Sequence, residues 1–151
     1  MSIEKDISQS KFRNEYQKTA INLIYTYNWM HEKMKDFFDR EKITGQQFNI
    51  LRILRGAGKP ISTLQIRQRM LDKMSDTSRI VDRLILKGLA KKIVCPNDKR
   101  LVDVSITDKG KKLLEKMEQY EPEMDAIFEN LSTSEAKTLN TLLDKIRSSN
   151  D

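Results

Sequence analysis

The middle of the chain carries a run of short polar side chains that ends in arginine, Ser75-Asp76-Thr77-Ser78-Arg79, and Arg83 follows four residues later. Residues four apart lie on one face of a helix, so both guanidinium groups would project in the same direction. Short polar side chains let a helix backbone approach a partner closely, and an arginine can donate two hydrogen bonds to a phosphate or to the edge of a guanine. The spacing therefore indicates recognition of an anion or a nucleic acid.

A second cluster of cations stands between two β-rich runs, Leu89–Cys95 and Leu101–Ile106, of which the second alternates strictly between apolar and polar residues. The connecting segment, Pro96-Asn97-Asp98-Lys99-Arg100, has the composition of a turn. The pattern predicts a hairpin with Lys99 and Arg100 at its tip. An arginine in this position can enter the minor groove of DNA, where a narrow A·T-rich segment deepens the negative potential.

Helix starts offer further places for anions, because the first N–H groups of a helix have no partner within it. Capping-box spacing occurs at Thr44 and Ser62, each with a glutamine three residues later. Ser75 can cap a third helix, which ends at Gly88. We therefore expect the N–H groups near Ser62-Thr63 and near Ser75 to be suited to holding phosphates.

Three short helices followed by a hairpin with a basic tip form the arrangement of a winged helix-turn-helix. A helix is about 10–12 Å across and the major groove of B-DNA is about 12 Å wide, so one polar helix end can enter the groove and read base edges. The predicted fold is mainly α with a small β-hairpin wing. We expect one domain over residues 1–151, in which residues 44–111 form the DNA-binding lobe.

Amphipathic helices flank this lobe. Apolar residues recur at helical spacing over residues 8–40, which predicts one long helix or two helices with a bend. One helix of that length would be roughly 50 Å long, whereas a compact domain of this size has a radius of gyration of about 15 Å, so part of its apolar stripe needs a partner. We expect residues 8–40 and 112–149 to form the dimerisation region of a homodimer. Alternatively, a bent first helix folds back on its own core.

The distribution of charge supports an anionic partner. The chain has 28 basic and 22 acidic residues, a net charge of +6, but residues 62–112 alone hold 13 basic and 6 acidic residues. A central basic block beside an acidic C-terminal segment suggests a localised anion-binding face. The alternative interpretation is a set of solvated helix faces, in which Asp82 is the internal partner of Arg79 and Arg83.

Composition also excludes several kinds of site. One Cys and one His exclude an intramolecular disulfide and a Cys/His zinc centre within one chain, and they fit a reducing compartment. The sequence has neither a glycine-rich phosphate loop nor a supported Ser/His/Asp constellation, so we expect no enzyme activity, no catalytic residue, no metal and no cofactor. No apolar run approaches the roughly 20 residues that span a bilayer. We expect a cytoplasmic protein without membrane contact.

From Gln46 to Gly110 the sequence resembles the MarR-type winged-helix transcriptional regulators. The matching segments are residues 75–84, Lys87-Gly88-Leu89, the wing Asp98-Lys99-Arg100 and Val104–Gly110, and the flanking helices match in length and order. The resemblance implies a homodimer that binds double-stranded DNA at a pseudopalindromic operator and represses transcription. It places Arg79 and its neighbours in the major groove and Arg100, oriented by an ion pair with Asp98, in the minor groove. The expected DNA contacts are Ser62, Thr63, Ser75, Asp76, Thr77, Ser78, Arg79, Arg83, Asp98, Lys99 and Arg100.

Two positions depart from the usual pattern of the family. Lys91-Lys92 stands where Glu-Arg is more frequent, and Asp76 stands where a small hydroxyl residue is common. An aspartate so close to the groove repels phosphate unless it accepts from a cytosine amino group or pairs with Arg79.

The resemblance also implies release from DNA by a small aromatic, often anionic, effector that binds between the dimer helices and the lobe. The candidates on the first long helix are Tyr25, Tyr27, Trp29, Met30, Met34 and Phe37. Methionine and aromatic residues at helical spacing fit ordinary core packing as well.

Two alternative functions stay open. A winged-helix lobe can bind a protein partner, which would need an apolar patch on the helix that starts near Ser75, where the sequence instead has polar and charged residues. A redox-responsive regulator would use Cys95, because the nearby Lys91, Lys92 and Lys99 favour a reactive thiolate. The competing interpretation of Cys95 is a packing residue at a strand end.

Overall fold

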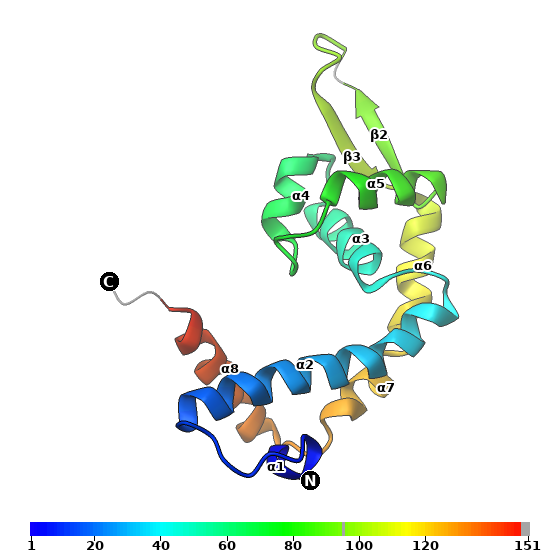
Figure 1. Ribbon diagram of the computed structural model, residues 1–151. Coiled ribbons are helices and arrows are strands. Elements are labelled where there is room, and N and C mark those ends of the chain that lie inside the picture. Colours follow the sequence, from blue (N-terminus) through cyan, green and yellow to red (C-terminus); the bar gives the residue numbers. More distant parts are fainter. Residues whose placement is uncertain (95, 149–151) are drawn as a thin grey trace. The chain divides into compact units, whose positions relative to one another are not determined.

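The structure is a computed structural model that describes residues 1–94 and 96–148, so the redox candidate Cys95 lies outside the described residues. The chain separates into two compact units, the first covering Met1–Gln119 and the second beginning at Tyr120. The first unit contains the N-terminal helices and the winged lobe, and the second contains the C-terminal helices (Figure 1).

The winged lobe is the central part of the first unit. Its strands β1 (Ile61–Ser62), β2 (Ala90–Val94) and β3 (Val102–Ile106) form an antiparallel sheet in the order β1-β3-β2. Val104 lies opposite Ile61 on one side and Lys92 on the other. Figure 1 shows the β2–β3 hairpin extending beyond α5. The predicted fold, mainly α with a small β wing, is confirmed, whereas the two-residue β1 is too short to give a periodic signal. The described elements of the lobe are α3 (Gly45–Ala57), β1 (Ile61–Ser62), α4 (Thr63–Arg69), α5 (Thr77–Leu86), β2 (Ala90–Val94), β3 (Val102–Ile106) and α6 (Asp108–Glu118).

The hydrophobic core of the lobe consists of the inward faces of these helices and of β3. Burial of one such aliphatic side chain contributes about 1.5–3 kcal/mol. The pattern of buried positions therefore decides which face of each helix remains exposed. The side chains exposed by 2% or less are Ile50, Leu51, Leu54, Ile61, Ile66, Met70, Val81, Leu84, Val104, Leu114 and Met117.

The helix starts of the lobe match the capping patterns in the sequence with one correction. Thr44 and Ser62 each accept a hydrogen bond from the N–H three residues later, at 3.1 and 3.2 Å. The N-cap of α5, however, is Asp76 and not Ser75, because Asp76 Oδ1 accepts from the N–H of Arg79 at 3.2 Å. The prediction failed by one residue because aspartate caps as well as serine, and the Ser75 hydroxyl closes the preceding turn instead.

The N-terminal region contains α1 (Ile3–Asp6) and α2 (Glu15–Arg40). The predicted helix over residues 8–40 is therefore wrong at its start and correct at its end. Ser8 has φ of 54°, outside the right-handed helical region. Asn14 then caps α2 by accepting from the N–H of Gln17 at 2.9 Å. The helix has 26 residues, which gives a length of roughly 39 Å.

An ion pair attaches α1 to α2. Glu4 accepts a hydrogen bond from the Lys18 ammonium, and this interaction lowers the pKa of Glu4 to about 2. Ile3 beside it is buried. No periodic pattern is visible in a helix of four residues, so the sequence did not predict α1.

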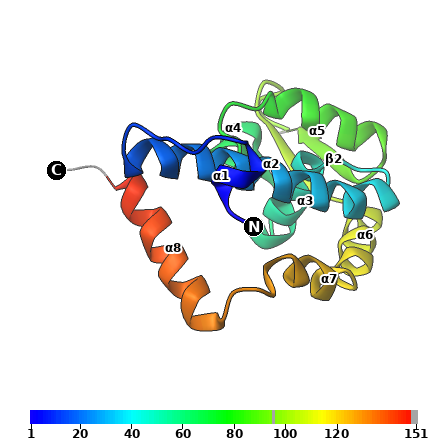
Figure 2. The ribbon, with the colours of Figure 1, turned by 60° about the horizontal axis from the view of Figure 1, so that its bottom comes forward.

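The second unit consists of short α7 (Glu121–Asp125), the 3₁₀ turn η1 (Ala126–Phe128) and α8 (Thr133–Arg147), which follow one another in Figure 2. Ser132 caps α8 with a capping box, in which its hydroxyl accepts from the N–H of Glu135 at 3.2 Å. Leu139, Leu142 and Ile146 lie on one side of α8 and are 41%, 52% and 60% exposed. Among the described residues, α8 thus has an exposed apolar face.

Gly110 in α6 is a position where we predict that a methyl group is not tolerated. A Cβ at Gly110 would lie 2.8 Å from Cγ1 of Ile106 and closer still to the carbonyl oxygen of Leu89, whereas a Cβ at Gly56 in α3 would meet nothing within 4 Å. Gly110→Ala should lower the free energy of unfolding by roughly 1–3 kcal/mol or more, and Gly56→Ala should raise it by about 0.5–1 kcal/mol. Urea unfolding followed by circular dichroism measures both changes, and equal stability of the two variants would contradict the close packing of α6 on β3.

Candidate nucleic-acid interface

The helix α5 has one buried and one exposed face. Ile80, Val81 and Leu84 are buried in the core, which turns Arg79 and Arg83 outward. Both arginines are exposed, and neither forms an ion pair or a side-chain hydrogen bond with any residue in the described part of the chain. The two guanidinium groups are therefore available to a partner, in agreement with their spacing in the sequence.

Asp76 is neutralised in part by its position. Its carboxylate accepts from the backbone N–H of Arg79 and lies at the positive end of the α5 dipole. The sequence left open a bond to a cytosine or a pair with Arg79, and the structure shows the backbone bond. This arrangement reduces, without removing, the repulsion that an aspartate exerts on an approaching phosphate.

Asp82 pairs with the wing and not with its own helix. Its Oδ1 lies 2.9 Å from Nζ of Lys92 on β2. The interpretation in which Asp82 is the internal partner of Arg79 and Arg83 is therefore wrong. A neighbouring strand competes successfully for the carboxylate because α5 and β2 pack against each other. The exposed pair contributes little to stability, but it connects the recognition helix to the hairpin.

The hairpin tip has a fixed arginine. Nε and Nη2 of Arg100 each lie 3.0 Å from one oxygen of Asp98, and the backbone N–H of Arg100 donates to the same carboxylate at 3.0 Å. The hydrogen bonds from the Arg100 side chain and backbone hold the pKa of Asp98 below its ordinary value. The expected ion pair is thus present, while the Arg100 side chain stays 90% exposed. Lys99 beside it is exposed as well.

The side chains at the start of α4 are less accessible to a partner than the sequence suggested. The Ser62 hydroxyl is occupied by its capping box, and Thr63 is half-buried. Thr77, which was expected to face a partner with Ser75 and Ser78, is only 4% exposed. Its hydroxyl therefore lies behind the surface of the lobe.

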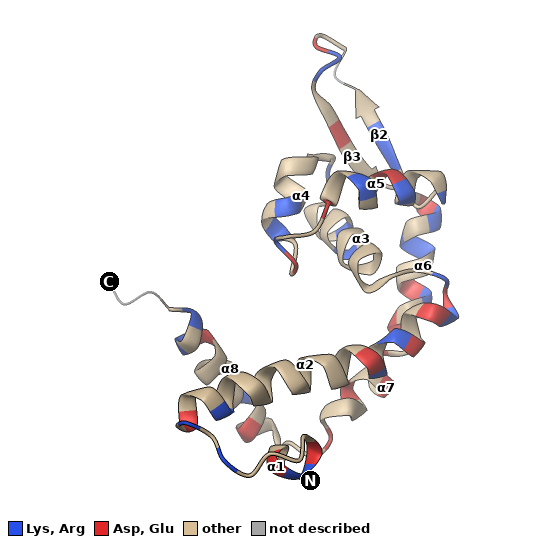
Figure 3. Cartoon of the chain, viewed as in Figure 1, with Lys and Arg blue, Asp and Glu red and all other residues tan. Residues whose placement is uncertain are grey.

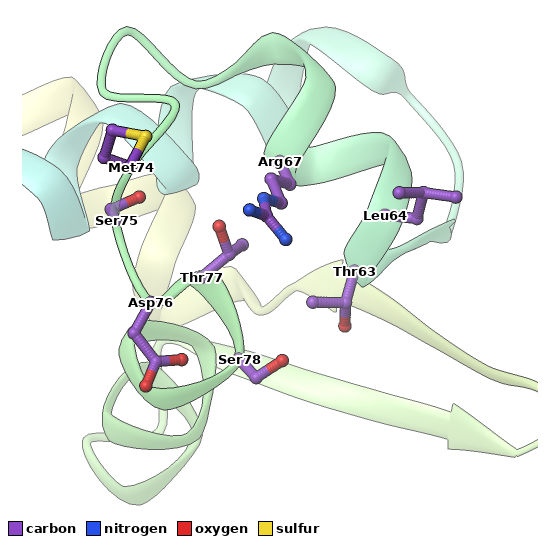
Figure 4. A pocket seen from close by; sticks show the side chains of 8 residues that line it. All are labelled: Thr63, Leu64, Arg67, Met74, Ser75, Asp76, Thr77 and Ser78. Atoms are coloured by element: carbon purple, nitrogen blue, oxygen red, sulfur yellow. The ribbon is translucent and has the colours of Figure 1, made fainter.

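Arg67 is a residue of this region that the sequence analysis missed. It projects from α4 toward the start of α5 and lines a cavity of about 460 Å³ together with Thr77 and Ser78 (Figure 4). Its place one helical turn after Thr63 was the available signal.

Basic side chains gather on the same lobe (Figure 3). All 13 lysines and arginines of residues 62–112 are exposed. They occur on α4, α5, β2 and α6, directly after α5, and in the α4–α5 and β2–β3 loops. Solvent-exposed cations of this number around one helix and one hairpin produce a positive potential that attracts a polyanion.

The effector candidates lie along α2. Tyr27 is exposed, Met30 and Met34 are half-buried, and Phe37 is buried with the guanidinium of Arg40 5.1 Å from its ring centre. Neither the cavity beside Arg67 nor a smaller one of about 170 Å³ beside Lys59 is lined by these side chains. The two further candidates, Tyr25 and Trp29, are exposed.

Within residues 1–94 and 96–148, no three His, Cys, Asp or Glu side chains gather in a way that could hold a metal ion. The described helices include none whose length and apolar content would allow it to cross a membrane.

An exposed arginine pair on the third helix of the lobe and a hairpin with a fixed arginine define a winged helix-turn-helix DNA-binding protein. Comparison with known proteins agrees. The chain is 32% identical to the multiple antibiotic resistance protein MarR of Salmonella typhimurium over 128 residues, which cover 82% of this chain and 88% of that protein. It is 31% identical to the transcriptional regulator PecS of Dickeya dadantii over 113 residues, 72% of this chain and 68% of PecS.

The chain belongs to the MarR family and is a DNA-binding transcriptional regulator. Among solved structures, a mutant of Escherichia coli MarR in complex with operator DNA matches with a TM-score of 0.81 and 26% identity, covering 92% of this chain and all of that one. The Bordetella bronchiseptica protein BpsR, at 23% identity and a TM-score of 0.77 over 87% of this chain and 99% of its own, shares the fold. A scan of family models gives no match.

We predict that the Asp98–Arg100 pair persists in solution. The folded-state pKa of Asp98 is depressed, so the pair is complete at neutral pH and is lost only as the pH falls through that lowered value. A pH titration of the Asp98 carboxyl by NMR should give a midpoint below the ordinary value for an aspartate, and Arg100→Gln should raise that midpoint. A normal midpoint in the wild type would contradict the geometry of the wing.

Proposed function

We propose that the protein is a homodimeric repressor that binds a pseudopalindromic operator through one winged lobe per subunit. The observation that carries the proposal is the exposed face of α5, where Arg79 and Arg83 have no partner in the described chain while Arg100 is held ready on the wing. A cation without an internal partner loses no existing ion pair on meeting a base or a phosphate. MarR of Escherichia coli has been solved in complex with operator DNA, and the similarity in fold supports the same mode of binding.

In the proposed complex the start of α5 enters the major groove. Arg79 is positioned to donate two hydrogen bonds to a guanine, which distinguishes base pairs by about 1–3 kcal/mol. Arg83, one turn further along, and Lys99 neutralise phosphates. Arg100, which is held by Asp98 and remains exposed, reaches the minor groove, which narrow A·T-rich DNA makes most attractive to a cation. Ser62, Ser75 and Ser78 complete the contacts with the backbone.

The proposed dimer is supported by apolar surface that the described part of the chain leaves exposed. On α2, Tyr16, Ile24 and Tyr27 are 85%, 64% and 59% exposed, and α8 has its own uncovered leucine face. Helices with such faces pack in pairs, and an isologous twofold interface covers the same face on both subunits. We propose residues 44–111 as the DNA-binding lobe and residues 8–40 and 112–149 as the dimerisation region.

Regulation by a small aromatic anion is the finer part of this proposal. DNA binding by BpsR is regulated by 6-hydroxynicotinic acid, and an effector of similar chemistry would bind this chain along α2, at Tyr27, Met30, Met34 and Phe37. The effector must bind one lobe spacing better than the other in order to shift the equilibrium. A cytoplasmic location fits a protein that acts on DNA. The protein-interaction alternative lacks support, because the exposed face of α5 is polar as far as Leu86.

The roles of Arg79 and Lys99 predict different effects on DNA affinity. Arg79→Ala should reduce the preference for operator over unrelated DNA by about 1–3 kcal/mol, whereas Lys99→Ala should weaken binding to all sequences alike and lower the salt slope by about one per lobe. Six to ten phosphate contacts should weaken wild-type binding by roughly 10³–10⁵ between 50 and 200 mM salt. Fluorescence anisotropy with duplexes selected from a random library measures these effects. Failure of the wild type to select any duplex at low salt would refute DNA recognition.

The proposed dimer predicts that two glutamate substitutions on α8 have different effects on the oligomeric state. Leu142→Glu places a charge in the proposed apolar interface and should yield monomers at micromolar concentration, because an unpaired buried charge is costly. Asn140→Glu adds the same charge to an exposed polar position and should leave the dimer intact. Sedimentation equilibrium gives the masses. If the wild type is itself a monomer, the dimer proposal fails.

A further inference from the structure

The turn between α2 and α3 contains a lysine in a left-handed backbone conformation. Lys42 has φ of 54°, a region that favours glycine because glycine has no Cβ to clash. The N–H groups of Lys42 and Ile43 donate to the carbonyls of Asp39 and Phe38 at 3.1 and 3.2 Å, so the turn ends α2 as a Schellman motif. The connection between α2 and the winged lobe is therefore a defined turn and not a flexible linker.

Lys87 at the end of α5 binds to this turn. Its ammonium donates to the carbonyl of Lys42 at 2.6 Å and to Oε1 of Gln47 at 3.1 Å. Gln47 is only 4% exposed, and the same Oε1 accepts from the N–H of Thr44 at 3.1 Å, so this acceptor cannot turn away without breaking the capping box of α3. The recognition helix is thus joined directly to the segment that connects α2 with the lobe.

A ring contact also joins α2 to the lobe. The rings of Phe38 on α2 and Phe48 on α3 lie 5.3 Å apart at an angle of 47°. Apolar contact depends little on direction, so it allows small rotations of one element over another. A hydrogen bond, in contrast, weakens steeply when its geometry changes. The bonds of Lys87 are therefore suited to fix an angle that the ring contact alone leaves adjustable.

The acceptors of Lys87 are neutral oxygens. Within the described residues no carboxylate pairs with this lysine, and its side chain is exposed. Hydrogen bonds from an ammonium are stronger than those between neutral groups, which favours the bonded orientation. Water can nevertheless replace both acceptors at an exposed site. The link thus holds one orientation of the lobe without preventing another.

We propose that Lys87 is a positioning residue for operator recognition. Its bonds to Lys42 and Gln47 fix the angle between the lobe and α2, and in a dimer joined through α2 this angle determines the spacing of the two half-sites. The inference rests on the proposed dimeric DNA-binding function, and Lys87 lies outside the set of proposed DNA contacts. A dimer selects one half-site spacing only if both lobes are held at a fixed angle.

This role separates half-site spacing from general affinity for DNA. One base pair inserted between the half-sites moves one of them by about 3.4 Å and rotates it by roughly 35°. A lobe held by Lys87 cannot follow this displacement, whereas a released lobe follows it but has lost its preorganisation for the original spacing. A duplex with a single half-site engages one lobe, so its affinity does not depend on the angle.

Lys87→Met tests the proposal, because methionine keeps most of the side-chain length and removes the donor. Affinity for a selected operator should fall roughly three- to tenfold, the penalty of one inserted base pair should shrink by a similar factor, and half-site affinity should match that of the control. The control is Lys109→Met, which removes the same charge and a 2.8 Å bond from Lys109 to the Lys87 carbonyl. It should keep the wild-type insertion penalty. Fluorescence anisotropy measures all three affinities.

An insertion penalty in Lys87→Met equal to that of the wild type would overturn the proposal. So would a half-site affinity that falls as far as the affinity for the full operator, because Lys87 would then act within the lobe or on DNA directly.

Gln47→Glu tests the same contact in the opposite direction and serves if Lys87→Met does not fold. Glutamate suits the third position of a capping box, and its carboxylate would accept a stronger hydrogen bond from the Lys87 ammonium. The insertion penalty should rise roughly threefold at unchanged half-site affinity, and a constant or smaller penalty would overturn the proposal. A wild type that tolerates the insertion without loss would overturn it as well, whereas a wild type that binds no duplex would refute the proposed function itself.

Discussion

The buried face of α5 is the constraint on which the rest of the interface depends. Ile80, Val81 and Leu84 can be excluded from water only in one rotation of the helix, and that rotation directs Arg79 and Arg83 outward. An isolated helix of ten residues would not be stable in water. The exposed face of α5 is therefore helical only because the opposite face is packed in the core. Recognition of DNA is therefore a consequence of the core. A core substitution that rotates α5 by a fraction of a turn would displace the arginines without touching them.

Some cations of the lobe are held in position by ion pairs, and others are available to an external partner. Lys92 is tied to Asp82, and Arg100 to Asp98, whereas Arg79 and Arg83 have no partner among the described residues. Exposed pairs add little stability, so their effect is geometric. The bidentate bond with Asp98 restricts the rotamers of Arg100 in advance and reduces the entropy lost when the wing meets a groove. The acidic residues of this basic surface thus orient the cationic side chains with which they pair.

The sequence predicted the elements well where a periodic or capping signal spans several residues. The capping boxes at Thr44 and Ser62 and the alternating strand that ends at Ile106 are found where the pattern placed them. The prediction was wrong where two adjacent residues can both cap a helix, as Ser75 and Asp76 can at the start of α5. The ion-pair partner of Asp82 could not be predicted from the sequence either. Asp82 pairs with Lys92 because α5 packs on β2, and a local sequence pattern does not show this packing. That Arg67 and Thr77 line one cavity depends on the angle between α4 and α5, which a local pattern does not record.

Contacts between α2 and the lobe indicate how a movement of one would reach the other. Lys87, which caps the end of α5, donates to the carbonyl of Lys42 at 2.6 Å and to the Gln47 side chain at 3.1 Å. Glu41, which caps the end of α2, pairs with Lys116 of α6. The recognition helix and the long N-terminal helix are therefore joined through a few residues at their ends. Under the proposed function, an effector that changes the position of α2 need not reach α5 itself, because these contacts transmit the displacement to the end of the recognition helix, and the packed core moves the lobe as one body.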